Sequence, residues 1–300
     1  MSKYYDISDD EIRVVGSGPS PKNEGHHGPR SAAIWIMAIV AVLLVIGGIL
    51  LFLKRRSVEP NEPGLFESGD STTVQYIVGP EKVIPFGDYS DTTGLAYTEV
   101  IEKTVNDIPL SIFIPHNAVP ELCLGSPNYL DRNIILTTQA ADIRKDNKKI
   151  VGAFVLKGQP LAWGLSKKGY CGIIDGEITV GVADNSPLFE QATETEGYFF
   201  RQFALVDNGT LVENELKNKS IRKALCERAG EVFVVKCETP ESFHDFAQAL
   251  VDLGVNNAIY LVGSTSYGFW YDKEGNVTEF SDLRHSKYKY ESYILWRTTQ

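Results

Sequence analysis

The feature that most constrains this chain is an uncharged apolar stretch that runs from Ser31 to Leu53. As a helix rising 1.5 Å per residue, it would span roughly 34 Å, enough to cross a bilayer core. A buried core helix fits less well, because the stretch is apolar on every face and ends abruptly at Lys54-Arg55-Arg56. A cleaved signal peptide also fits less well, because a long polar segment precedes the stretch. We therefore predict a single-pass transmembrane helix over residues 31–53.

The rest of the chain divides around this anchor. Residues 1–30 are polar and are expected to form a flexible tail, and residues 54–71 are expected to form a linker. Residues 72–300 are expected to form one globular domain, because no internal repeat or second low-complexity break interrupts them. The composition of the chain, 43% hydrophobic and 23% charged, is typical of a folded protein.

Charge and cysteine content exclude several classes of function. The formal net charge of -10 opposes binding to a nucleic-acid backbone, so no nucleic-acid partner is expected. The four cysteines are too few for a disulfide scaffold, and no CxxC pair indicates a zinc site. P-loop, HExxH, GxSxG and GxGxxG motifs are all absent from the sequence. No metal site is therefore predicted, and the cofactor requirement is left open.

The globular domain is predicted to be α+β, with a mixed sheet. Apolar, β-branched runs of strand length occupy residues 150–156, 231–235 and 258–262. Asp175-Gly176 and Asn208-Gly209 are turn pairs that predict two hairpins, and residues 270–277 suggest a third.

A helix is predicted from Pro240 to Leu253, with Thr239 as its N-cap and Gly254 just after its end. Its apolar residues recur with helical spacing and form a core-facing stripe (Phe243, Phe246, Ala247, Leu250 and Val251). A shorter helix is expected over residues 186–197. The order strand, helix, strand predicts a βαβ unit with parallel strands and a right-handed crossover. Ligands in such units bind beyond the carboxyl ends of strands, which here means residues 262–266.

Two segments in this region are candidates for anion binding. Gly263, Ser264 and Ser266 could offer backbone N–H groups and hydroxyls to a phosphate. The alternative is a tight turn leading into an aromatic strand. Arg222 could bind a phosphate or carboxylate through both arms of its guanidinium group. The alternative is a solvated basic stretch.

Two further pairs of neighbouring polar residues are candidates for a functional role. Arg201 and Gln202 stand among aromatic residues, which suits a sugar ring but equally suits a packed strand edge. His244 and Asp245 lie at the start of the predicted helix and are the candidate catalytic acid and base. Adjacent helical residues diverge, so the two do not readily form a dyad with each other. The alternative is that they cap the helix.

The order and spacing of four segments resemble the phosphodiester glycosidase family. These are residues 205–209, 220–224, 245–254 and 257–266, and the resemblance covers roughly residues 150–270. It carries over most directly to Arg222, Asn257, Gly263 and Ser266. Val262 stands where the family has an aspartate, and Tyr260 replaces a family asparagine. The N-terminal motif of the family cannot be identified in this sequence. Residues 137–142 or 152–154 lie near the position where it is expected.

The resemblance implies a membrane-anchored hydrolase of a sugar phosphodiester or a related envelope glycan. Arg222 would hold the phosphate, the loop from Gly263 to Ser266 would donate to its oxygens, and His244 and Asp245 would serve as acid and base. The sugar would be oriented by three polar side chains (Asn257, Gln202 and Arg201). The alternative is a catalytically lapsed glycan-binding or envelope-assembly protein of the same fold, which Val262 favours. The expected ligand is a carbohydrate or sugar phosphate.

The location of the domain rests on two opposing arguments. Lys54-Arg55-Arg56 follows the apolar stretch, whereas only Lys22 and Arg30 lie close before it. The positive-inside rule would therefore keep the domain in the cytosol. The family resemblance implies an exported domain, because its substrates are glycoconjugates outside the cytosol. We expect an inner-membrane protein with a periplasmic domain.

Overall fold

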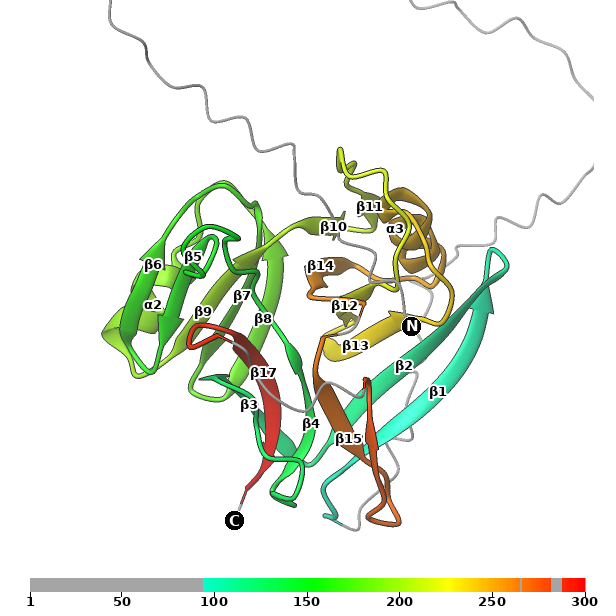
Figure 1. Cartoon of the computed structure of the whole chain (residues 1–300), viewed down its shortest axis with the longest axis horizontal. Helices are drawn as coiled ribbons and strands as arrows, with labels where there is room; N and C mark the ends of the chain where they lie inside the picture. The colour runs from blue at the N-terminus through cyan, green and yellow to red at the C-terminus, as the bar shows by residue number, and fades with distance from the viewer. Residues whose placement is uncertain (1–93, 265, 282–287, 300) are drawn as a thin grey trace, which may run out of the picture. The chain divides into compact units, whose positions relative to one another are not determined.

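The computed structural model describes residues 94–264, 266–281 and 288–299. The polar tail, the predicted transmembrane helix over residues 31–53, the linker and the expected start of the domain at residue 72 all lie outside the described residues. Among the residues that are described, no helix has the length and apolar character needed to cross a membrane. Strands dominate the described part of the chain, and the helices α2 (Leu188–Glu194) and α3 (Phe243–Asp252) are short (Figure 1).

The largest sheet has seven strands and forms the centre of the domain. In spatial order they are β1 (Tyr97–Val105), β2 (Ile108–His116), β13 (Glu231–Cys237), β12 (Lys223–Arg228), β14 (Asn257–Leu261), β10 (Ala204–Asp207) and β11 (Thr210–Leu211). Side chains alternate along the strands, so the central strands β2, β13, β12 and β14 contribute to the core on both faces. On β12, for example, Ala224 and Cys226 join the core under α3, whereas Leu225 joins the core on the other side.

Two five-stranded sheets pack against the second face. One has the order β16 (Val277–Glu279), β15 (Gly268–Tyr271), β4 (Ile134–Gln139), β17 (Ser292–Thr298) and β3 (Ala118–Leu124). The other has the order β6 (Gln159–Trp163), β5 (Ala153–Leu156), β9 (Tyr198–Gln202), β7 (Gly169–Ile174) and β8 (Glu177–Val182). One continuous core joins all three sheets, with Leu225, Leu136 and Phe154 as buried members from each. The helix α2 lies against β5, β7 and β9 (Figure 1).

The three predicted hairpins are confirmed. Asp175 and Gly176 both have positive φ angles, of 51° and 83°, and join β7 to β8. Asn208 and Gly209 join β10 to β11 in the same way. Both turns need left-handed backbone at two successive residues, which Asp, Asn and Gly adopt at low cost. The third hairpin joins β15 to β16.

The prediction of a mixed sheet is wrong for the described strands, because every pair of hydrogen-bonded neighbours is antiparallel (β1 with β2, for example). The strands β13 and β14, which flank α3, do run parallel to each other, since both are antiparallel to β12. They are not neighbours, however. The tight turn at Ala229 and Gly230 folds β12 against β13, so β12 occupies the position between them.

The main helix begins later than predicted. Its N-cap is Ser242 rather than Thr239, because the Ser242 hydroxyl accepts a hydrogen bond from the Asp245 backbone N–H at 3.0 Å. Glu241, one residue earlier, is held by backbone hydrogen bonds to Ser220, which is incompatible with a helix starting at Pro240. The predicted end is confirmed, since Gly254 follows the helix with a φ of 85°. The apolar stripe is buried against the central sheet.

The cap gives a test of this assignment. Replacing Ser242 with alanine removes the acceptor for the Asp245 N–H and should lower the free energy of unfolding by about 1 kcal/mol. Urea denaturation of the Ser242→Ala variant measures the change. The matched control is Ser166→Ala, at an exposed position, which should leave stability unchanged. Equal stability of the two variants would contradict the assigned cap.

Candidate functional site

A buried lysine links the central sheet to the loop that follows β14. Lys223, on β12, is 1% exposed and directs its Nζ between two hydroxyl groups. It donates to the Thr138 Oγ1 on β4 at 2.9 Å and to the Ser266 Oγ at 2.6 Å. The Nζ also lies 4.8 Å from the centre of the Phe280 ring. One side chain therefore connects two sheets and the loop.

Burial changes the charge state of this lysine. Desolvation, assisted by the nearby positive charge of Lys236, lowers the pKa of Lys223 from 10.5 to about 7. Lys236 is the direct cross-strand partner of Lys223, and its own ammonium group is paired with Glu238 at 2.6 Å. The Lys223 amine can therefore be neutral near neutral pH.

The loop from Val262 to Ser266 is fixed by backbone contacts. A Cβ atom on Gly263 would come within 2.4 Å of the Ile221 carbonyl oxygen, so only glycine fits there. The Gly263 N–H donates to the Tyr260 hydroxyl at 3.1 Å, and the Ser264 N–H donates to the Ile221 carbonyl at 2.8 Å. The Ser266 hydroxyl donates to the Val262 carbonyl at 2.6 Å. The backbone donors predicted to bind an anion are thus used within the protein, and the Ser264 side chain is exposed.

A second buried lysine, Lys167, lies just before β7 and contacts the segment that follows β4. The Lys167 Nζ donates to the Asp142 carboxylate and, at 2.6 Å, to the Gln202 amide oxygen. The Gln202 amide nitrogen in turn donates to the Ala140 carbonyl at 3.3 Å. Lys167 and Gln202 are buried, but the Asp142 side chain is 31% exposed. The cluster therefore holds one carboxylate at the surface by means of buried partners.

An aromatic array connects this cluster to Arg222. The Lys167 Nζ lies 4.3 Å from the centre of the Phe203 ring, and the Arg222 guanidinium lies 4.3 Å from that of Phe243. Phe243 packs against both Phe203, at 5.7 Å, and Tyr260, at 4.9 Å, between ring centroids. Two cations thus stack on one aromatic cluster.

The Tyr260 hydroxyl is a neutral proton donor in this setting. Burial raises the pKa of Tyr260, and the charge of Asp142 raises it further. A tyrosine whose pKa is raised stays protonated at neutral pH. Tyr260 therefore presents a neutral hydroxyl to the loop after β14, where it accepts the hydrogen bond from the Gly263 N–H.

The two predicted arginines are largely committed to backbone carbonyls. Arg222 is 4% exposed, and its Nε donates to the Glu241 carbonyl at 3.0 Å while Nη2 donates to the Asn218 carbonyl. Arg201 donates to three carbonyls, from residues 167, 183 and 184, at 2.8 to 3.0 Å. Both side chains hold loops in place. The phosphate-binding role of Arg222 and the sugar-orienting role of Arg201 stay predictions.

Three other predicted residues lie outside this cluster. Asn257 begins β14, at the opposite end from Gly263, where its amide donates to Glu227 at 2.9 Å. His244 is exposed and pairs with Glu213 at 2.9 Å, and Asp245 accepts from Ser242 in the helix cap. His244 and Asp245 line a separate surface pocket of about 300 Å³. Their acid–base role also stays a prediction, whereas Gln202 lies within the Lys167 cluster.

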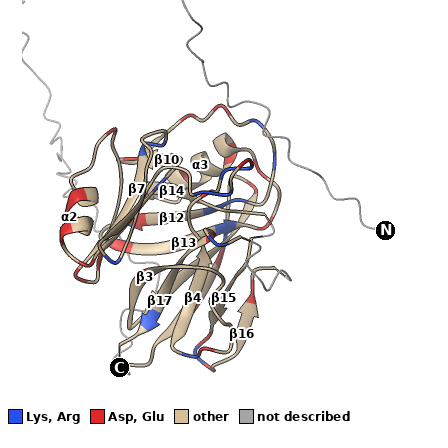
Figure 2. Ribbon diagram, turned by 60° about the vertical axis from the view of Figure 1, so that its left-hand side comes forward, with Lys and Arg blue, Asp and Glu red and all other residues tan. Residues whose placement is uncertain are grey.

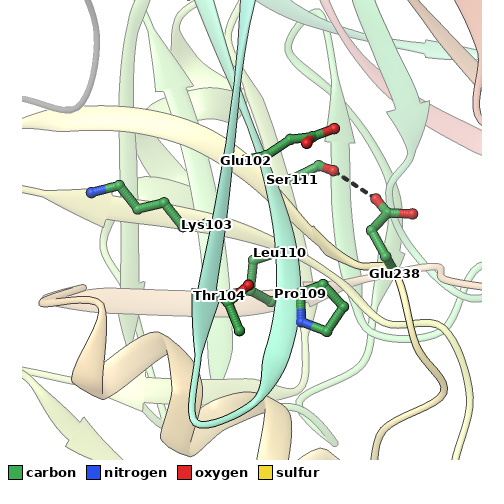
Figure 3. A pocket seen from close by; sticks show the side chains of 7 residues that line it. All are labelled: Glu102, Lys103, Thr104, Pro109, Leu110, Ser111 and Glu238. Carbon is green, nitrogen blue, oxygen red and sulfur yellow. Dashed lines mark hydrogen bonds between the residues drawn. The ribbon is translucent and has the colours of Figure 1, made fainter.

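Figure 3 shows another pocket, of about 240 Å³, beside the hairpin of β1 and β2. Its central contact is a hydrogen bond from the Ser111 hydroxyl to Glu238, at 2.7 Å. Ser111 pairs across the sheet with Lys236, which pairs with Lys223, so a polar row joins this pocket to the buried amine. The pocket itself contains none of the predicted site residues.

Sequence reasoning missed five residues of the cluster. Thr138 and Asp142 stood in the segment considered for the N-terminal family motif, and Lys223 stood next to Arg222. Tyr260 was noted only as a departure from the family pattern. Lys167 gave no local signal, because its partners Asp142 and Gln202 lie 25 and 35 positions away. Only the folded chain brings these groups together.

Comparison with known proteins gives one family match. The model described as phosphodiester glycosidase matches residues 133–291, just over half of the chain. No curated protein sequence matches.

Two solved structures are similar at low identity. One is the zebrafish N-acetylglucosamine-1-phosphodiester alpha-N-acetylglucosaminidase catalytic domain auto-inhibited by its pro-peptide, with 11% identity and a TM-score of 0.48. The match covers 69% of this chain and 83% of that chain. The other is a hypothetical protein from Synechocystis, with 11% identity and a TM-score of 0.49, covering 68% of this chain and 62% of that chain.

The buried amine predicts a specific pH dependence of stability. Between pH 7 and pH 10.5 the folded chain holds fewer protons on Lys223 than the unfolded chain does. The free energy of unfolding should therefore rise with pH across this window because of this group. Lys223→Met lacks this contribution. The free energy of unfolding of the natural chain minus that of Lys223→Met should therefore increase as the pH is raised from 7 to 10.5. Urea denaturation of both proteins at several pH values measures this.

The control for this comparison is Lys103→Met, on the exposed edge of β1. A pH-dependent difference that is specific to Lys223→Met assigns the effect to the buried amine and not to the loss of any lysine. A flat difference for Lys223→Met would show that Lys223 titrates alike in the folded and unfolded chains, which would contradict the assigned charge state.

Proposed function

The chain belongs to the phosphodiester glycosidase family, and from that premise we propose that it is a membrane-anchored hydrolase of a sugar phosphodiester or a related envelope glycan. The observation that carries this proposal is the Asp142 carboxylate, which is partly exposed and is fixed by the buried Lys167. Val262 offers no carboxylate where the family has an aspartate. In our proposal Asp142 takes over the acid–base chemistry.

One carboxylate is sufficient for this reaction. Most glycosidases need a second carboxyl group to protonate the departing oxygen. A phosphate monoester, by contrast, is a weak base with a second pKa of about 6, so it can leave as an anion without a proton donor. In the proposed step, a water oxygen bonds to the anomeric carbon as the bond from that carbon to the phosphate oxygen breaks. Asp142 accepts the proton from the water.

The surroundings of Asp142 suit an anionic sugar. Lys167 and Arg222 supply positive charge on either side of the aromatic cluster. Phe203 is partly exposed and offers a ring face of the kind on which a sugar can pack. The neutral Tyr260 hydroxyl can donate to a sugar or phosphate oxygen. The expected ligand is therefore a carbohydrate that carries a phosphate.

The second candidate function is binding without catalysis. It is favoured by Val262, and by the ion pair to Lys167, which already occupies one oxygen of the Asp142 carboxylate. In that case the chain would serve as a glycan-binding or envelope-assembly protein. Assays of binding and of hydrolysis distinguish the two functions. Binding without catalysis predicts measurable glycan affinity but no hydrolysis, both for the natural chain and for Val262→Asp.

The hydrolase proposal predicts the behaviour of Asp142→Asn. The amide is of equal size but cannot accept the proton, so kcat on a sugar 1-phosphodiester should fall by about 100-fold or more. Phosphorus NMR of the full chain with a panel of sugar phosphodiesters measures this loss. The matched control is Asp146→Asn, which should keep full activity. Asp146 is exposed, lies four residues after Asp142 and pairs with Arg144.

A second variant separates catalysis from folding. Asp142→Asn removes the carboxylate that pairs with the buried Lys167 ammonium group, so the stability of this variant should fall. The double variant Asp142→Asn with Lys167→Gln removes both charges and should recover stability without recovering turnover. Full activity in the stable double variant would remove Asp142 from the mechanism.

A further inference from the structure

An exposed apolar stripe runs along the outer strand of one sheet. β6 is the edge strand of the five-stranded sheet that carries α2 (Figure 1). Leu161, Trp163 and Leu165 recur at every second residue, and Trp163 and Leu165 are 65% and 64% exposed. Single exposed apolar residues are common on protein surfaces. Here Leu161 and Trp163 share one face of β6, and Leu165 follows two residues beyond its end, so the three together mark a contact surface.

The edge is not built for pairing with another strand. Pro160 lacks the N–H group that an added strand would need, and a register shift interrupts the pairing of β6 with β5. Proline and irregularities of this kind protect sheet edges from strand addition. The contact surface therefore acts through its side chains, not through its backbone.

A basic segment lies next to the Trp163 end of the stripe. Trp163 pairs with Ala153, and a Cβ on Gly164 would lie 3.3 Å from Gly152. The turn just before them carries four basic residues and one acidic residue (Arg144, Lys145, Asp146, Lys148 and Lys149). Lys145 and Lys149 are exposed, and Arg144 forms an ion pair with Asp146. This is a basic surface on a chain whose net charge is -10.

The opposite end of β6 has the opposite charge. The turn at Gly158 packs against residues 192–196, at the end of α2. The helix carries Glu190 and Glu194 and is followed by Glu196 (red in Figure 2). An anionic surface would therefore attract the Trp163 end and repel the α2 end, which sets one orientation.

We propose that Leu161, Trp163 and Leu165, with Lys145 and Lys149, form a docking surface for an anionic lipid bilayer. Tryptophan and leucine insert at the level of the headgroups, and lysine pairs with anionic headgroups. The predicted anchor, which ends at Leu53, would keep a bilayer within reach of the domain. Lys167, which binds Asp142, follows Leu165 by two residues in the chain. This surface is separate from the proposed catalytic chemistry and does not depend on it.

The test uses the full chain reconstituted in vesicles of phosphatidylglycerol and phosphatidylcholine with brominated acyl chains. Bromine quenches a tryptophan that enters the lipid, and the Trp163 contribution is the difference between the natural chain and Trp163→Phe. The matched control places the reporter elsewhere. Leu130 is equally exposed, at 65%, in the connection between β3 and β4, so Leu130→Trp in the Trp163→Phe background reports a site away from the stripe.

We expect bromine to quench the Trp163 contribution and not to quench the tryptophan at residue 130. Quenching of Trp163 should be lost in vesicles of phosphatidylcholine alone. It should also be lost in the double variant Lys145→Glu, Lys149→Glu. An unquenched Trp163, or equal quenching at both positions, would overturn the proposal. Protection of Trp163 from a water-soluble quencher in detergent, increasing with protein concentration, would also overturn it and assign the surface to a second copy of the chain. Turnover of a water-soluble sugar phosphodiester by Trp163→Phe should be unchanged, so this test is independent of the hydrolase proposal.

Discussion

The buried amine of Lys223 is the contact on which the candidate site depends. A lysine deep in a core costs free energy unless it is neutral or its protons find partners. Here the partners are the hydroxyls of Thr138 and Ser266, which come from different parts of the fold. Lys223 lies on β12 in the central sheet, Thr138 lies on a second sheet, and Ser266 lies in the loop after β14. The amine therefore sets the position of that loop relative to both sheets.

The loop after β14 differs from the family pattern in its charged groups. Val262 stands in the loop after β14 where the resemblance to the family implies an aspartate, and in our proposal Asp142, after β4, provides the carboxylate instead. Lys167 pairs with that carboxylate and is itself held by the Gln202 amide oxygen. A phosphate leaving group makes one carboxylate sufficient, because no acid is needed to protonate it. The departure from the family motif is thus compatible with the family's chemistry.

Local features of the fold were predictable from the sequence, and contacts between distant residues were not. The turns at Asp175-Gly176 and Asn208-Gly209 follow from the backbone preferences of those residues. The stripe of α3 follows from helical spacing. Thr239 and Ser242 are both good N-caps, and only the pairing of Glu241 with Ser220 decides between them. The antiparallel order arose because β12 lies between the two strands that flank α3.

The site was harder to predict, because its parts come from separate strands. Gly263 and Ser266 lie in a constrained loop, which agrees with the alternative of a tight turn, and their anion-binding role stays a prediction. Gln202 belongs to the Lys167 cluster. The contact of Lys223 with Thr138 joins positions 85 residues apart, and no periodicity reports such a pair. Arg222 and Arg201 have the residue type expected of anion-binding groups, yet they bind backbone carbonyls. Residue type alone did not distinguish a ligand contact from a structural one.

The central claim is that water attacks the sugar carbon and phosphate departs, and the most direct test is to follow the oxygen atom. Turnover of a sugar phosphodiester by the full chain in ¹⁸O-labelled water places the label on one of two products. Label on the anomeric hydroxyl of the sugar is the result that the account predicts. Label on the phosphate would show attack at phosphorus, and the proposed glycosidase chemistry would then be wrong.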